Sequence, residues 1–286
     1  MSNVLIVYFS QGGSTAQIAE SITKGLRASG NKITLCNIRN DQPPSLEGYD
    51  ILGIGTPVYY FRPPFIITDY VNGLKHLKGM PAFVFVIHGT YKGETGNDIR
   101  HALSIKGAKE TGYFSCLGAD FYLPYLKEGY LFSADHPSTS ELSQAQKFGI
   151  QVDNIMAGQK YITPKYDPKP AIMYNLERFF ANHWLVKTLY RRLFHVNKIK
   201  CSACDLCIKQ CPTGNITPDK DGHPVWNRHC LFCLNCEMIC PHEAITTPVS
   251  WPIFHPVIKY NVTHASKDAT IHHVRVKHRN GITTRQ

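Results

Sequence analysis

The sequence of 286 residues contains no apolar run close to the length of about 20 residues that a membrane-spanning helix needs. Its opening, MSNVLIVYFS, lacks the basic start and the small-residue cleavage site of a secretory signal peptide. The patterns GxxxxGK[ST] and GxGxxG are also absent, which disfavours nucleoside triphosphate chemistry and gives no fingerprint for direct NAD(P)H binding. We therefore expect an intracellular, cytoplasmic protein, and its 43% of hydrophobic residues is enough to build a core.

Acidic residues are scarce in the second part of the chain. Residues 1–156 hold 13 Lys/Arg and 13 Asp/Glu, whereas residues 157–286 hold 18 Lys/Arg and 8 Asp/Glu. The whole net charge of +10 therefore belongs to the second part. This asymmetry indicates two parts that are built differently.

The first part alternates strand-like and helix-like patterns. The expected strands are Asn3 to Ser10, Lys32 to Ile38, Tyr49 to Pro57, Met80 to Gly89 and Phe114 to Tyr122. The expected helices are Ser14 to Ala28, Pro64 to Leu77, Gly96 to Lys109 and Ser138 to Met156. Apolar strands that alternate with helices predict an α/β fold, a doubly wound five-stranded parallel sheet covered by helices on both faces.

Ligands of such folds bind in the loops beyond the carboxyl ends of the strands. The loop after the first expected strand is SQGGSTAQ, which runs directly into a helix. Its hydroxyl groups, its two glycines and the free N–H groups of the helix start could cradle a phosphate. The same residues could instead form an ordinary glycine-rich turn with Ser and Thr as helix caps.

The loops after the third and fourth expected strands favour the ligand-binding interpretation. They read GTPVYYFRPP and HGTYKGETGN, so each carries aromatic residues among Gly, Pro and Thr. A flat heteroaromatic ligand needs aromatic faces to stack on and backbone amides near its polar edge.

These loops resemble those of flavodoxins. Ser10, Gly13 and Thr15 match the [ST]-x-[ST]-G-x-T phosphate loop of that family, although Gly12 stands where a hydroxyl residue is usual, which should weaken the binding of FMN. The resemblance covers residues 1–156 and implies a flavodoxin-like fold that binds FMN. It implies that the phosphate is held by Ser10, Gln11, Gly13, Ser14 and Thr15. It also implies that the flavin is flanked by Thr56, Pro57, Tyr59 and Tyr60 on one face and by Gly89, Thr90, Tyr91 and Gly93 on the other.

Eight of the ten cysteines lie in one segment of the second part. The stretches CSACDLCIKQCP and CLFCLNCEMICP both have the spacing C-x2-C-x2-C-x3-C-P, and the second repeats the first 29 residues later. This spacing resembles that of bacterial ferredoxins with two [4Fe-4S] clusters, in which the fourth Cys of each run binds the other cluster. The implied ligands of the first cluster are Cys201, Cys204, Cys207 and Cys240, and those of the second are Cys230, Cys233, Cys236 and Cys211.

Structural zinc is the alternative for paired CxxC motifs, but zinc needs neither the third Cys nor the Cys-Pro. Between the two runs, ITPDKDGHPVWN is typical of a β-hairpin with its turn at Asp221-Gly222. The remaining Cys36 and Cys116 lie in expected strands without a ligand-type neighbour, so we expect them to be buried and inert.

The patterns together divide the chain into four parts. Residues 1–156 form the FMN-binding domain, residues 157–197 a basic aromatic linker, residues 198–248 a small α+β two-cluster domain, and residues 249–286 a basic tail. The stretch Glu177 to Phe194 has the apolar periodicity of a helix, which either packs the domains together or docks to an acidic partner or a membrane surface. The tail, which is interrupted by proline, is expected to wrap the cluster domain or to stay mobile.

Read together, the two parts resemble flavodoxin–ferredoxin fusion proteins of anaerobes, which implies electron transfer between clusters and FMN with a ferredoxin-like protein as donor or acceptor. The alternative is an FMN-dependent reductase, an oxidoreductase that binds a small organic acceptor over the flavin. Its pocket would be lined by Tyr59, Tyr60, Phe61, Arg62, His88 and Lys92. The candidate catalytic residues are then His88, Tyr59 and Tyr91, with a proton donated by His88 or a tyrosine. A redox sensor that binds nucleic acid through its basic tail is the least favoured hypothesis.

Overall fold

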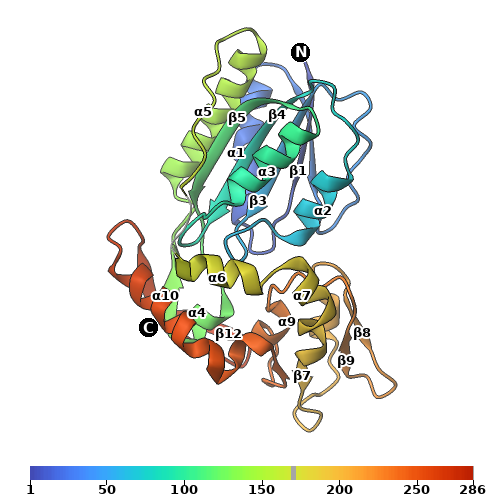
Figure 1. Cartoon of the computed structure of the whole chain (residues 1–286), viewed down its shortest axis with the longest axis vertical. Helices are drawn as coiled ribbons and strands as arrows, with labels where there is room; N and C mark the ends of the chain where they lie inside the picture. Colours follow the sequence, from blue (N-terminus) through green and yellow to red (C-terminus); the bar gives the residue numbers. More distant parts are fainter. Residues whose placement is uncertain (169–171, 286) are drawn as a thin grey trace. The chain divides into compact units, whose positions relative to one another are not determined.

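The computed structural model describes residues 1–168 and 172–285. The chain folds into two compact units, one formed by Met1–Ala119 with Asp135–Tyr174 and the other by Asp120–Ala134 with Asn175–Gln286 (Figure 1). Residues 169–171 of the predicted linker and residue 286 of the predicted tail lie outside the described residues. Across the described parts of the chain, no helix is both long and apolar enough to cross a membrane.

The first unit is built on a parallel sheet of five strands. The strands are β1 (Asn3–Tyr8), β2 (Lys32–Asn37), β3 (Ile51–Pro57), β4 (Pro81–His88) and β5 (Lys109–Leu117), and their order in the sheet is β2-β1-β3-β4-β5. The central strands β1, β3 and β4 are almost wholly buried because their apolar runs are covered on both faces. This architecture and strand order are flavodoxin-like, and they place the loops after β1, β3 and β4 at one edge of the sheet.

Helices cover both faces of this sheet. Helices α1 (Ser14–Ala28) and α5 (Thr139–Met156) pack together on one face, while α2 (Phe65–Gly73) and α3 (Thr95–Ile105) lie on the other (Figure 1). Gly25 and Gly149 allow α1 and α5 to approach closely, since an added Cβ at Gly25 would lie 2.0 Å from the carbonyl oxygen of Gln146. The core on the α1–α5 face includes Phe83, Phe85 and Phe148.

The expected boundary between the third helix and the fifth strand is wrong. Helix α3 ends at Ile105 rather than Lys109, and β5 begins at Lys109 rather than Phe114. Gly107 has a φ of +79°, a left-handed conformation that ends the helix and that only glycine adopts at little cost. The stretch KETG, read as helix and turn, therefore forms the first half of the edge strand.

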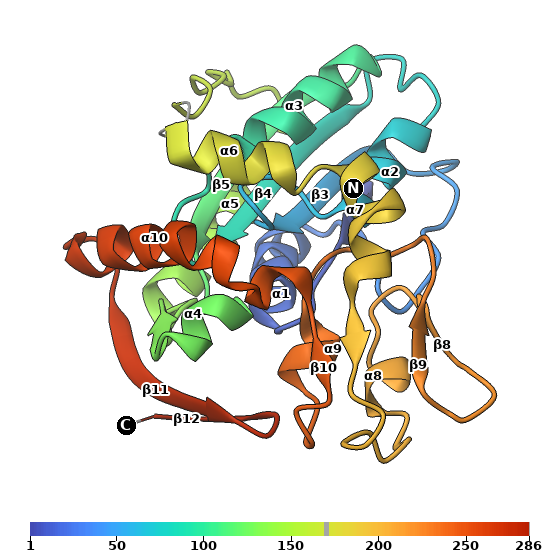
Figure 2. The same cartoon turned by 60° about the horizontal axis from the view of Figure 1, so that its bottom comes forward.

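The second unit contains a segment that the sequence pattern assigned to the first domain. Helix α4 (Leu123–Lys127) and strand β6 (Tyr130–Phe132) belong to it because β6 pairs with β11 (His273–Arg279), which also pairs with β12 (Ile282–Arg285). Helix α10 (His255–Lys267) precedes this hairpin, so the described part of the tail is ordered into a helix and two strands (Figure 2). The short turns η2 (Pro248–Ser250) and η3 (Pro252–Phe254) lead into α10.

The expected linker helix Glu177 to Phe194 is divided. The structure has α6 (Ile172–Phe180), α7 (His183–Thr188) and the turn η1 (Tyr190–Leu193) instead of one helix. Asn182 interrupts the run because its side-chain oxygen accepts a hydrogen bond from the N–H of Leu185 at 3.0 Å and so caps α7. Phe179 and Trp184 on these helices are 65% and 69% exposed.

The cysteine-rich segment folds as an internal repeat. Its elements are β7 (His195–Val196), α8 (Leu206–Lys209), β8 (Ile216–Pro218), β9 (Pro224–Trp226), α9 (Asn235–Met238) and β10 (Ile245–Thr246). Strand β8 pairs antiparallel with β9, as the hairpin prediction requires, and β7 pairs antiparallel with β10. The short helices α8 and α9 contact each other (Figure 2).

Candidate functional site

The loop after β1 leads into α1 without a side-chain cap from its N-cap residue. That residue, Gly13, has a φ of +95°. The hydroxyl of Ser10 accepts a hydrogen bond from the N–H of Ala16 at 3.2 Å, and Ser10 itself is held by Asn37 at the end of β2. Thr15 is buried, whereas Gly12 is exposed. The loop is therefore a turn fixed by backbone geometry at the start of a helix, where anions bind.

The loop after β3 forms a tight reverse turn. Tyr59 and Arg62 exchange two backbone hydrogen bonds of 2.9 and 3.1 Å, and Tyr60 and Phe61 between them have φ values of +52° and +59°. Two successive left-handed residues with side chains are costly, by about 1–3 kcal/mol each, and such strain is concentrated at functional sites. The hydroxyl of Tyr59 donates a hydrogen bond to Gln11 at 3.0 Å, which joins this loop to the first one.

The loop after β4 contacts the loop after β3. Gly93 has a φ of +54°, and an added Cβ there would lie 2.8 Å from the Cβ of Phe61. Nδ1 of His88 lies 2.9 Å from the carbonyl oxygen of Thr90, which fixes Nδ1 as the protonated nitrogen and leaves Nε2 as an acceptor. Burial lowers the pKa of His88 to about 4, so its imidazole is neutral at pH 7.

The structure thus brings the three predicted loops together at one edge of the sheet. Gln11 is joined to Tyr59 by a hydrogen bond, and Phe61 touches Gly93 across the second and third loops. Thr56 is fully buried, and its hydroxyl donates to the carbonyl of Pro57 at 2.9 Å. Its hydroxyl hydrogen is therefore used at the end of β3, and the hydroxyl oxygen is left as an acceptor.

Two residues at this edge were missed by the sequence analysis. Arg39, two residues after the end of β2, donates a hydrogen bond from Nη1 to the carbonyl of Gln11 at 3.2 Å. A basic residue at the carboxyl end of a parallel strand is the signal that could have identified it. Tyr174, from helix α6, packs on both aromatic loops, and no local pattern pointed to it.

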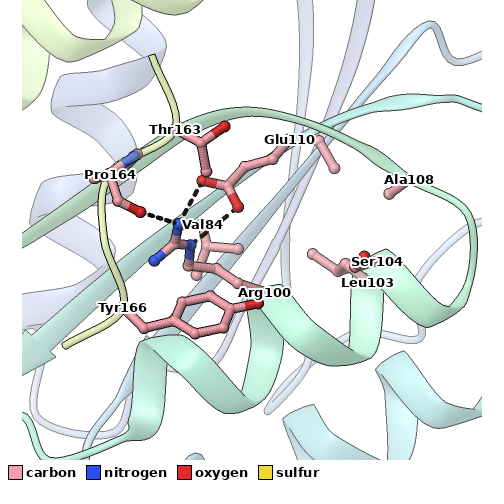
Figure 3. A pocket seen from close by; sticks show the side chains of 10 residues that line it. Val84, Arg100, Leu103, Ser104, Ala108, Glu110, Thr163, Pro164 and Tyr166 are labelled. Atoms are coloured by element: carbon pink, nitrogen blue, oxygen red, sulfur yellow. Dashed lines mark hydrogen bonds and ion pairs between the residues drawn. The ribbon is translucent and has the colours of Figure 1, made fainter. Parts of the chain in front are cut away.

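A segment of the predicted linker is attached to the α3 side of the same unit. The buried guanidinium of Arg100 forms two hydrogen bonds with the Glu110 carboxylate, at 2.9 and 3.0 Å, and one with the carbonyl of Pro164 at 2.7 Å (Figure 3). The Tyr166 ring stacks on the guanidinium, with Cζ of Arg100 4.8 Å from the centre of the ring. Arg100, Glu110, Pro164 and Tyr166 form part of the wall of a cavity of about 390 Å³. Figure 3 shows their side chains and the hydrogen bonds of Arg100 to Glu110 and Pro164.

The two cysteine runs share one backbone conformation. Ala203 and Asp205 in the first run, like Phe232 and Leu234 in the second, have positive φ values between 52° and 60°. In each run a backbone N–H donates to the fourth sulfur at 3.3 Å, from Asn215 to Cys211 and from Ala244 to Cys240. Each of these pairs is separated by the 29 residues that separate the two runs, so the sequence repeat is also a structural repeat.

Cysteines of both runs meet in space. One cavity is lined by four of them, three from the first run and the last from the second: Cys201, Cys204, Cys207 and Cys240. Burial raises the pKa of Cys230 to about 12, and the neighbouring thiols of Cys233 and Cys211 act in the same direction. The first three cysteines of the first run therefore lie beside the fourth cysteine of the second run, and Cys230 of the second run lies near Cys211 of the first.

The environment of these thiols is apolar. Ile216, Trp226 and Ile245 form a buried cluster with Cys236. Burial raises the pKa of Cys236 well above its usual value, and that of Cys207 to about 11. Thiolates at such positions need a positive charge beside them.

Within residues 1–168 and 172–285, no three His, Cys, Asp or Glu side chains are grouped as ligands of a single metal ion. Thiolates around one zinc ion all lie about 2.3 Å from it. In an iron–sulfur cube each thiolate binds a different iron, so the ligands are spread around a larger group.

Comparison with known proteins gives one family and a set of structures. A model of the flavodoxin domain matches residues 5–127. No curated protein matches the chain. Similar solved structures include a flavodoxin from the domain Archaea (14% identity, 54% of this chain and 99% of that chain, TM-score 0.44). Flavodoxin 1 from Bacillus cereus has 17% identity over 54% of this chain and 98% of its own, with a TM-score of 0.42. Rubredoxin oxygen:oxidoreductase from the anaerobe Desulfovibrio gigas has 13% identity over 55% of this chain and 36% of its own, with a TM-score of 0.42.

The family match covers β1 from Leu5 onward, the other four strands of the parallel sheet and the three loops at its carboxyl edge. The N-terminal part of this chain is therefore flavodoxin-like.

Proposed function

We propose that this chain is an electron-transfer protein that holds FMN in its flavodoxin-like unit and two [4Fe-4S] clusters in its cysteine-rich segment. The observation that carries the second half of the proposal is the cavity lined by Cys201, Cys204, Cys207 and Cys240, because it combines cysteines of both runs. The match of residues 5–127 to a flavodoxin domain supports the first half.

The residues at the edge of the sheet fit FMN. Gly13 has no side chain to cap α1, so the start of the helix could receive an anion beside the N–H of Ala16 that Ser10 accepts, and Arg39 adds positive charge nearby. Hydroxyls of Ser10, Ser14 and Thr15 complete the phosphate loop, while the aromatic loops around Tyr59 and Tyr91 offer faces to a flat ring. Gly12 contributes no hydroxyl, but it is exposed and lies at the rim of the loop.

The cysteine-rich segment fits two clusters. We assign Cys201, Cys204, Cys207 and Cys240 to one cluster and Cys230, Cys233, Cys236 and Cys211 to the other. Burial raises the pKa of the Cys207, Cys230 and Cys236 thiols, so they would carry negative charge only beside a cation such as iron. Backbone N–H groups that donate to the sulfurs of Cys211, Cys230 and Cys240 stabilise negative charge on them, which is one way that proteins adjust cluster potentials.

A bound cluster exchanges single electrons, whereas a bound flavin exchanges one or two, so the pair would connect one-electron protein carriers to two-electron chemistry. The chain's own residues supply the surroundings of each group. The apolar cluster around Trp226 packs against four of the cysteines, Cys207, Cys211, Cys236 and Cys240. The reverse turn at Tyr60 and Phe61 fixes the flavin loop. A ferredoxin-like protein is the partner that this arrangement suits best.

His88 is poorly suited to be the proton donor of a reductase of a small organic acceptor, which leaves a tyrosine for that role. A reductase needs a proton donor beside the flavin, and at pH 7 a histidine with a pKa of about 4 carries its second proton in about one molecule in a thousand. With Nδ1 donating to Thr90, Nε2 offers an acceptor. His88 is thus suited to hold a hydrogen bond and poorly suited to supply protons.

Electron relay can be tested with Cys204→Ser and Cys233→Ser, each of which removes one ligand from one proposed cluster. A reduced ferredoxin should reduce the FMN of the unmodified protein, and either variant that still retains FMN should be reduced more slowly by at least tenfold. Dithionite, which reaches the flavin directly, serves as the control and should reduce all three proteins at similar rates. Equal rates with ferredoxin in all three proteins would rule out the relay through the clusters.

A panel of small organic acceptors separates the carrier from the reductase. The carrier hypothesis predicts turnover limited by protein partners only. Saturable turnover with a small acceptor, lost on replacement of Tyr59 or Tyr91, would establish the reductase instead.

A further inference from the structure

Tyr174 connects the two aromatic loops of the proposed flavin site. Its ring centre lies 4.5 Å from that of Phe61 and 5.4 Å from that of Tyr91, with the rings inclined by 49° and 44°. Phe61 follows β3 and Tyr91 follows β4, whereas Tyr174 comes from helix α6 after the last helix of the α/β unit. Only 5% of Tyr174 is exposed, so its ring is a buried part of this edge.

The contact with Phe61 acts on the strained part of the loop. Phe61 has a φ of +59°, and its backbone and Cβ lie against Gly93, where an added Cβ would come within 2.8 Å of the Cβ of Phe61. Phe61 is therefore held between the glycine of the third loop and the ring of Tyr174. Packing of this kind is what maintains a left-handed residue in a folded protein.

The segment that precedes Tyr174 is attached to the same loop. The carboxylate of Asp167 accepts from Nζ of Lys92 at 2.6 Å and from the hydroxyl of Tyr113 at 2.5 Å. Asn97, at the start of α3, exchanges two hydrogen bonds of 2.9 Å with the backbone of Asp167. The Asp167 side chain is only 9% exposed, so these hydrogen bonds are buried and hold this segment firmly against the loop.

We propose that Tyr174 is a positioning residue of the flavin site, which ties the loops around Phe61 and Tyr91 into one conformation and covers the edge between them. This inference rests on the proposed binding of FMN. Loops that are already ordered lose less conformational freedom when a ligand binds, so affinity is higher. The ring also adds an aromatic group to the site from the last residue of the first unit, beyond helix α5.

The test compares Tyr174→Ala with Tyr174→Phe, which keeps the ring, and with Tyr166→Ala as a matched control. Tyr166 lies in the same segment, is 55% exposed and stacks on Arg100 instead of the aromatic loops. Apoprotein is titrated with FMN by flavin fluorescence, and iodide quenching of the bound flavin reports its access to water. Urea unfolding of each variant shows that it is folded.

Tyr174→Ala should raise the Kd for FMN about tenfold, as expected for the loss of two aromatic contacts, and should increase iodide quenching. Tyr174→Phe and Tyr166→Ala should both stay within about twofold of the unmodified protein. If the unmodified protein binds FMN and Tyr174→Ala binds it equally well with unchanged quenching, the role of Tyr174 is refuted while the flavin site stands. If the unmodified apoprotein binds no FMN, the flavin site and the role of Tyr174 are both refuted.

Discussion

Acidification should destabilise the N-terminal unit through His88. In the folded protein, burial lowers the pKa of this histidine from 6.5 to about 4. Below pH 6.5 His88 binds a proton in the unfolded chain, whereas in the folded chain it stays neutral until the pH reaches about 4. The stability contributed by neutral His88 is therefore complete above pH 6.5 and is lost as the pH falls from 6.5 to about 4.

The size of the effect follows from the difference between the two pKa values. At about 1.4 kcal/mol for each pH unit, it amounts to about 3 kcal/mol when the pH has reached 4. The variant His88→Asn removes the titrating group but keeps a side-chain N–H that can donate to the carbonyl of Thr90. The free energy of unfolding of the unmodified protein, minus that of His88→Asn, should fall by about 3 kcal/mol between pH 7 and pH 4.

The assay is urea unfolding, followed by circular dichroism on anaerobic protein at several pH values between 7 and 4. His101→Asn, at an exposed position on α3, controls for the loss of an imidazole in general. Other groups titrate in this range, but they are common to both proteins and cancel in the difference. A difference between the unmodified protein and His88→Asn that stays constant over the whole range would refute the reasoning.

Three further substitutions test other contacts. Cys211→Ser should reduce the iron content from about eight to about four per chain. Adding Cys230→Ser to this variant should remove no more iron, whereas adding Cys201→Ser should remove the rest. The reverse pattern would disprove the crossed ligation. Arg100→Met leaves the Glu110 carboxylate without its buried partner and should lower the free energy of unfolding by about 3 kcal/mol, measured in urea; a loss below about 1 kcal/mol would show that the pair contributes little. Gly93→Ala places a Cβ 2.8 Å from Phe61 at a φ of +54° and should weaken FMN binding and lower the free energy of unfolding by about 1–2 kcal/mol; unchanged binding and stability would show that the loops can shift.

The strands and helices of the first unit were largely predictable because their signals are local. Apolar runs that end in Gly, Pro or Ser mark β1, β3 and β4, and the periodicity of α1 and α5 follows from burial of one face. The start of β5 was misplaced because KETG has no apolar alternation and the helix-ending role of Gly107 depends on its φ. Strand β6 was missed since it is three residues long and pairs with β11, far away in the sequence.

The residues of the candidate sites likewise divide into those with a local sequence signal and those placed by tertiary packing. The spacing of the cysteines is the one that two clusters would require, so the proposed ligands could be named from the sequence alone. The three loops at the edge of the sheet follow from strand positions. Arg39 follows the carboxyl end of a predicted strand and could have been identified. Asp167 and Tyr174 reach that edge only through tertiary packing, and a single tyrosine or aspartate in a linker carries no sequence signal.

The central claim, one chain that carries both a flavin and two iron–sulfur clusters, is tested most directly by cofactor analysis of protein purified without oxygen. Iron, acid-labile sulfide, zinc and released flavin are measured on the same sample. The account predicts about eight iron, about eight sulfide and about one FMN per chain. Two zinc ions with no sulfide, or clusters without any flavin, would contradict it.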